Sequence, residues 1–85
     1  MIQAIPYPAC MNAAQCRAAR GLVNWSQDQL AKVSTVSVTT VRNFERGAIS
    51  PTANNLAALR RALEGAGVIF VDENGQGAGV RLRKD

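Results

Sequence analysis

The chain has 85 residues, ten Lys and Arg against six Asp and Glu, a net charge of +4 and no His. This length allows one domain at most. The core of so small a domain gives only marginal stability, and self-association would add to it. The chain lacks a His, a cluster of metal ligands and a base beside either Cys, and we therefore expect neither an enzyme nor a bound cofactor or metal. The mild basic excess suits a nucleic-acid partner.

Residues 1–10 contain two prolines and show no helical period, so we interpret them as an N-terminal extension without a fold of its own. The extension has no Lys or Arg, which argues against an arm that enters a minor groove. It also lacks the basic segment and apolar run of a signal peptide, and no stretch of the chain approaches the roughly 18 apolar residues of a membrane span. We therefore expect a cytoplasmic protein.

A capping box predicts the first helix and opens the helical domain expected over residues 11–67. Asn12 is the cap, Gln15 is placed to reach back to it, and Met11 precedes it and is an alternative start of the protein. The helix should run to residue 22 or 23. Cys16 lies six residues after Cys10 and so on a different helix face, and we expect two buried or half-buried thiols.

Two short helices joined by a tight turn are predicted between Ser26 and Gly47. Ser26 and Gln29 have the spacing of a capping box, and Ser37 opens a second run that stops at Gly47, a residue that tolerates positive φ. The expected helices cover residues 27–33 and 38–46. Apolar residues give each helix an inward face: Leu30, Ala31, Val36, Val41 and Phe44. This is the layout of a helix-turn-helix, whose second helix fits a DNA major groove.

The second helix of this pair presents a face suited to reading bases. At about 100° per residue, its outward residues fall within an arc of roughly 140°. Asn can bond an adenine, Arg a guanine, and the methyls of Val and Thr can contact thymine. We therefore predict base readout by Val38, Thr39, Arg42 and Asn43. Contacts to phosphates, which position a protein on DNA, are predicted for Ser26, Gln27, Lys32, Thr40 and Arg46.

A fourth helix follows the breaker at residues 49–52. Ser50 as cap with Pro51 in the first turn would start it, with Thr52 as the alternative cap. Leu56, Leu59 and Leu63 recur at helical spacing and should face the core. The helix is expected to reach residue 64, because Gly65 and Gly67 end it.

The tail, residues 68–85, changes to the period of a β-hairpin. Residues 68–71 and 79–83 read as strands around a turn-rich loop. An isolated hairpin is barely stable in water, so this one must pack against something. One possibility is that two hairpins pair in a dimer, with Val68, Phe70, Val80 and Leu82 as interface candidates. The alternative is a hairpin folded back on its own helices, with dimerisation through the fourth helix.

Residues 15–67 resemble the Cro/cI-type (XRE family) helix-turn-helix of phage repressors and small bacterial regulators. The resemblance lies in Ser26-Gln27-x-x-Leu30-Ala31, Val36-Ser37, Val41, Phe44-Glu45-Arg46-Gly47 and Pro51. The segments CRAARGLVNWSQ and GVRLRK are similar to those of a small alphaproteobacterial subgroup. The chain departs from the family in having Thr35 where Gly is usual. About three extra residues also separate Arg20 from Ser26, which implies a longer first helix.

The resemblance implies a mainly α fold, a four-helix, lambda-repressor-like helix-turn-helix domain with a C-terminal β-hairpin. It also implies that Arg17 pairs with Glu45 and ties the first helix to the third. The function it implies is sequence-specific DNA-binding transcriptional regulation, with repression through a homodimer on a palindromic operator in double-stranded DNA. The alternative is a protein-interaction module of the same fold, such as an antiactivator or antitoxin. We expect neither a membrane partner nor a small-molecule ligand.

Overall fold

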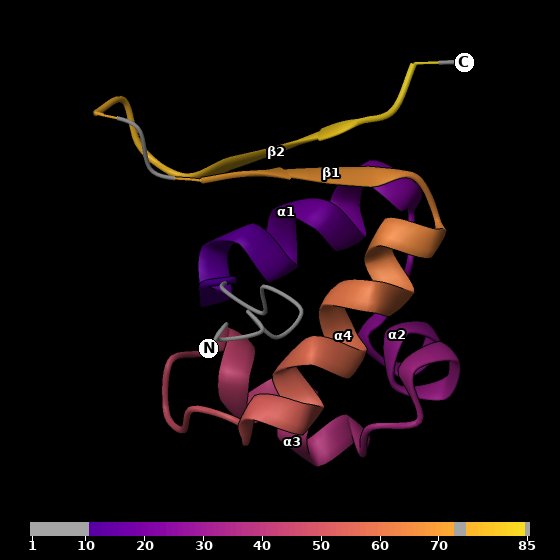
Figure 1. The fold of residues 1–85 in the computed structure, drawn as a ribbon. Coiled ribbons are helices and arrows are strands. Elements are labelled where there is room, and N and C mark those ends of the chain that lie inside the picture. The colour runs from indigo at the N-terminus through magenta and orange to yellow at the C-terminus, as the bar shows by residue number, and fades with distance from the viewer. Residues whose placement is uncertain (1–10, 73–74, 85) are drawn as a thin grey trace, which may run out of the picture.

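Four helices are followed by two strands in the computed structural model, which describes residues 11–72 and 75–84 (Figure 1). The elements are α1 (Ala13–Val23), α2 (Gln27–Ser34), α3 (Val38–Glu45), α4 (Ala53–Gly65), β1 (Val68–Val71) and β2 (Gly79–Leu82). The expected fold class is confirmed. The expectations for residues 1–10, Cys10 among them, lie outside the described residues. Within the described ranges, no helix has the length and apolar content needed to cross a membrane.

Side-chain caps explain where the helices begin. Asn12 and Gln15 form the predicted capping box, in which Asn12 Oδ1 accepts from the Gln15 N–H at 2.7 Å and Gln15 Oε1 accepts from the Asn12 N–H at 2.9 Å. The hydroxyls of Ser26 and Ser37 cap α2 and α3, each accepting from the N–H three residues later. These bonds satisfy amide groups that have no partner within the helix.

The fourth helix begins at the alternative cap. Thr52 Oγ1 accepts from the Asn55 N–H at 3.2 Å, so the expected start at Ser50 with Pro51 inside the first turn is wrong. Thr52 has the extended backbone of a cap residue, and its hydroxyl satisfies a first-turn amide of α4. Pro51 therefore precedes the cap.

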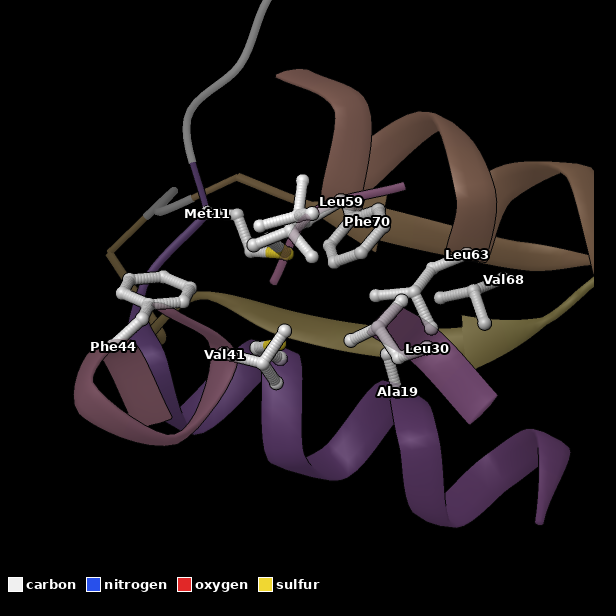
Figure 2. Close-up of a cluster of buried hydrophobic side chains, with 11 residues drawn as sticks. Met11, Ala19, Leu30, Val41, Phe44, Leu59, Leu63, Val68 and Phe70 are labelled. Carbon is white, nitrogen blue, oxygen red and sulfur yellow. The ribbon is translucent and has the colours of Figure 1, made fainter. Parts of the chain in front are cut away.

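The core draws on every helix and on β1 (Figure 2). Leu30, Val41, Leu59 and Leu63 are completely buried, and Phe44 joins them from the inward face of α3. The side chains predicted to face inward at helical spacing thus meet in one cluster. Met11 also belongs to it, so the residue before the first cap is anchored in the core.

The hairpin completes this core. Its strands are antiparallel, with Val68 opposite Leu82 and Phe70 opposite Val80. Figure 2 shows Val68 and Phe70 pointing into the same cluster as Leu59 and Leu63, and they are only 3% and 8% exposed. Val68 and Phe70 are therefore buried against their own helices, and their role in a dimer stays a prediction. Val80 packs against the core as well, whereas Leu82 remains 46% exposed.

Polar contacts hold the hairpin on the helices. The Gln15 side chain donates from Nε2 to the carbonyl oxygens of Val71 and Gly79, at 3.3 and 3.0 Å, and thus clamps both strands at the loop end. On the other side, the Arg60 guanidinium lies 4.8 Å from the centre of the Phe70 ring. The hairpin is therefore folded back on its own helices, which was one of the two arrangements expected from the sequence.

The turn between α2 and α3 contains a strained residue. Thr35 ends α2 with φ of 61°, in the left-handed region that favours glycine. This conformation costs an L-residue about 1–2 kcal/mol, and a β-branched side chain tolerates it badly. Asn24 ends α1 with φ of 63°, but asparagine adopts this conformation more readily.

We predict that Thr35→Gly raises the free energy of unfolding by about 0.5–1 kcal/mol. Glycine relieves the strain but loses more backbone entropy on folding, so only part of the gain remains. Urea unfolding of the two proteins measures the difference. Asn24→Gly is the matched control and should gain less; an equal or larger gain there would contradict the assignment of strain to Thr35.

We also predict that truncation after Gly67 abolishes cooperative unfolding. Removing Val68 and Phe70 opens the core, and losing one buried Phe side chain alone costs about 3–5 kcal/mol. A domain of this size has only about 5–10 kcal/mol of stability in total. Circular dichroism melts test this, with removal of residues 84 and 85 as the control that should leave the melt unchanged. A truncated chain that still melts cooperatively near the full-length temperature would overturn the prediction.

Candidate nucleic-acid interface

The orientation of α3 follows from the contrast between its two faces. Val41, Phe44 and Glu45 are buried against the rest of the domain. Thr39 and Arg42 are exposed on the other side, and Val38 and Asn43 are half-buried there. The four side chains predicted to read bases therefore share the outward part of one helix. Arg46 ends α3, and Gly47 follows at φ of 78°, as its predicted role at the helix end requires.

An open groove of about 670 Å³ runs beside this face. It is shared by α1, the start of α2 and α3, and four arginines contribute to its walls. Its lining residues are Arg17, Arg20, Gln27, Thr39, Arg42, Asn43, Glu45 and Arg46. Positive side chains around a concave surface attract a phosphate backbone.

A buried carboxylate joins the three helices behind this groove. Glu45 is 2% exposed, and Arg20 grips its two oxygens from Nε and Nη2, each at 2.7 Å. Gln27 Nε2 donates to the same carboxylate at 3.0 Å, and Cys16 Sγ at 3.1 Å. Arg20 also donates to the Trp25 carbonyl oxygen, at 2.9 Å. We call these residues the Glu45 network.

Arg17, the expected partner of Glu45, meets it at the main chain. Arg17 does tie α1 to α3, but its Nη1 donates to the main-chain oxygen of Glu45, while Arg20 binds the carboxylate. Arg17 and Arg20 are three residues apart and so lie on the same face of α1. The last turn of α1 carries Arg20 and faces the carboxylate.

The network sets the charge states of its members. Burial by itself would raise the pKa of Glu45, but the hydrogen bonds from Arg20, Gln27 and Cys16 outweigh it and hold the pKa below its ordinary value. Burial, the hydrogen bond to Glu45 and its negative charge raise the pKa of the Cys16 thiol far above its ordinary range. Glu45 is therefore ionised at neutral pH, and Cys16 is the neutral buried thiol that its sequence context predicted.

The residues predicted to contact phosphates differ in their surroundings. Ser26 and Lys32 are exposed on α2, and Ser26 also caps the helix. Thr40 is half-buried, and its Oγ1 accepts from the Ser37 hydroxyl at 3.0 Å. Gln27 donates one amide hydrogen to Glu45, and this bond links the start of α2 to α3.

Arg42 on α3 and Arg46, which ends the helix, contact other polar side chains of the protein. Arg46 donates from Nε and Nη2 to Oδ1 of Asn43, at 3.1 and 2.8 Å. Arg42 Nη2 lies 3.8 Å from a carboxylate oxygen of Asp28 on α2, and both side chains are largely exposed. Asp28 and Cys16 were not among the predicted site residues; Asp28 carries no local signal, whereas Cys16 lies four residues before Arg20 on the same face of α1.

We predict that Glu45→Gln lowers the free energy of unfolding by about 2–3 kcal/mol at pH 7. Breaking a fully buried ion pair costs about 3–5 kcal/mol, but Arg20 keeps 19% of its side chain in solvent and so retains some hydration. Because the pKa of Glu45 is lowered by folding, its contribution is present above the ordinary value of 4.5 and is lost as the pH falls through the folded value.

Chemical denaturation at pH 7 and at pH 3 measures both effects. The wild type should lose more stability than Glu45→Gln between these two pH values. The matched control is Glu64→Gln, which removes a half-exposed carboxylate paired with Arg60 at 3.0 Å and should cost only about 0.5 kcal/mol. Equal losses for the two variants would show that the Glu45 network is not a major support of the fold.

Comparison with known families gives an independent view of these residues. A profile of the helix-turn-helix family of Cro/C1 type matches residues 17–65, which run from Arg17 to the end of α4 and include Arg20, Gln27 and Glu45. No curated protein matched the chain. The family match covers more than half of the 85 residues, and it agrees with the arrangement of α2 and α3. The chain therefore belongs to the Cro/C1-type helix-turn-helix family of DNA-binding regulators.

Proposed function

We propose that this protein is a cytoplasmic, sequence-specific transcriptional repressor that binds a palindromic operator as a homodimer. The observation that carries the proposal is the outward face of α3, which combines exposed Thr39 and Arg42 with half-buried Val38 and Asn43 beside a groove rich in arginine. These side chains match the donors, acceptors and methyl contacts used at base edges in the major groove. Their helix is held from behind by directional bonds to Glu45.

Charge compensation makes this face compatible with DNA. A carboxylate beside the groove would repel phosphates, but the carboxylate of Glu45 is buried and gripped by Arg20. Arg17 and Arg42 line the same groove and leave it with a positive balance. Ser26, Lys32 and Thr40 then supply phosphate contacts that fix the register of α3 without reading sequence.

Repression follows from occupancy alone. A domain that covers a promoter excludes the polymerase without needing a second activity, which makes repression the simplest outcome for this fold. One helix in a groove reads only a few base pairs, so useful specificity needs two half-sites about 34 Å apart, read by a symmetric dimer. The open edges of the hairpin and the outer surface of α4 are the surfaces that we consider for this dimer.

We predict that Thr39→Ala and Asn43→Ala each weaken binding to the selected operator by about 1–3 kcal/mol while changing affinity for random DNA little. Operators are first selected from a random pool, and affinities are then measured by gel shift at two salt concentrations. Arg81→Ala is the control for charge, because Arg81 lies on β2 at the opposite end of the domain from α3 (Figure 1).

The outcomes separate the two classes of function. Base readout by α3 is wrong if both variants bind the operator as the wild type does. If the wild type enriches no sequence and shows no salt-dependent binding, the proposed repressor function is wrong, and the protein-interaction alternative becomes the better one.

We predict that Leu82→Lys shifts the protein from dimer to monomer, because a lysine on an edge strand opposes pairing with a second hairpin. Leu82 is 46% exposed, and Val33 on α2 has the same exposed fraction, so Val33→Lys is a matched control that should remain dimeric. Sedimentation of both variants, with and without operator, measures this. If both variants remain dimeric, the dimer interface does not lie on the hairpin, and α4 becomes the better candidate. If the wild type is a monomer on DNA, the homodimer proposal is wrong.

A further inference from the structure

The contact between Arg46 and Asn43 bears on which base α3 reads. Both side chains line the groove beside α3, and both guanidinium donors of Arg46 converge on the single oxygen Oδ1 of Asn43. A guanidinium has no acceptor, so the amide oxygen is the atom of Asn43 that must face it. This fixes the orientation of the amide, with Nδ2 turned away from Arg46.

The bonding capacity of Oδ1 is used up by this arrangement. An amide oxygen has two lone pairs, and two N–H groups of Arg46 point at it, at 3.1 and 2.8 Å. A free Asn reads adenine by accepting from N6 and donating to N7, which requires both ends of its amide. With Oδ1 occupied, Asn43 has only the two hydrogens of Nδ2 to offer to a base.

We propose that Arg46 sets the base specificity of Asn43, by making it a donor-only reader that prefers guanine to adenine. Guanine presents two acceptors in the major groove, N7 and O6, whereas adenine presents N7 next to a donor, N6. A donor-only side chain is matched by the first pattern and opposed by the N6 donor of the second. Arg46 is then a positioning residue that acts through Asn43.

The proposal rests on base readout by α3, as proposed above, and differs from a phosphate contact by Arg46. A phosphate contact would add the same affinity to every DNA sequence and would not change which base is preferred. An orienting contact changes the preference at the one base that Asn43 faces. The two roles therefore differ in base preference, which a merely structural role of Arg46 would not change.

The test is selection from a random DNA pool with the wild type, Asn43→Ala and Arg46→Ala. The position whose preference disappears in Asn43→Ala is the base that Asn43 reads. We expect the wild type to favour guanine there by about tenfold over adenine, and Arg46→Ala to favour adenine. Affinities for two operators that differ only at this position then give the ratio directly, and Arg81→Ala should reproduce the wild-type ratio.

Each result decides the matter. Guanine retained in Arg46→Ala, adenine already preferred by the wild type, or no position lost in Asn43→Ala would overturn the inference while the selected motif still supports the DNA-binding function. A wild type that enriches no motif would overturn the function itself. If Arg46→Ala does not give a cooperative melt by circular dichroism, Arg46→Met replaces it, since methionine keeps an apolar stem and has no donor.

Discussion

The bidentate bond between Arg20 and Glu45 is the interaction on which the arrangement of the first three helices depends. A carboxylate that is 2% exposed is tolerated only if its charge is paired and its oxygens are bonded, and here Arg20, Gln27 and Cys16 all donate to it. Apolar contacts alone are not directional and would let α3 turn or slide against α1. The network permits one orientation, in which α3 turns Val41 and Phe44 inward and its polar residues outward.

The hairpin is the second element that holds this domain together. Eighty-five residues bury a limited core, and β1 supplies two of its side chains, Val68 and Phe70. Gln15 links the two halves, because its oxygen belongs to the cap of α1 and its nitrogen clamps both strands of the hairpin. The helix that carries Arg20 is therefore held at its start by the hairpin and near its end by Glu45.

The parts of this fold that could be predicted are those set by neighbours in sequence. Caps such as Asn12 and Ser37 bond an amide three residues away, so the starts of α1 and α3 follow from local chemistry. Even local chemistry can offer two candidate caps for one helix, and here Thr52 rather than Ser50 caps α4. The end of α3 could likewise be predicted from Gly47, and the buried face of β1 from the alternation of Val68 and Phe70.

The contacts between elements could not be predicted in the same way. Alternation shows which face of a strand is buried, but not whether the covering surface is its own chain or a second copy. Two arginines on one face of α1 are candidates for the Glu45 carboxylate, and only the folded chain shows that Arg20 binds it while Arg17 binds the main chain. The side chains of Gln27 and Arg46 face polar partners 18 and 3 residues away, and only the folded chain shows these contacts.

These internal contacts affect how the proposed DNA interface would gain specificity. Arg42 lies near Asp28, and Arg46 is bonded to Asn43, so both side chains already have polar partners before any DNA is bound. Holding long side chains in place lowers the entropy lost on binding. A carboxylate at the start of α2 suits the helix dipole but repels a phosphate backbone. Asp28 would therefore weaken binding to every DNA sequence alike, and the difference in affinity between operator and random DNA would come from the bases that Arg42 and Asn43 contact.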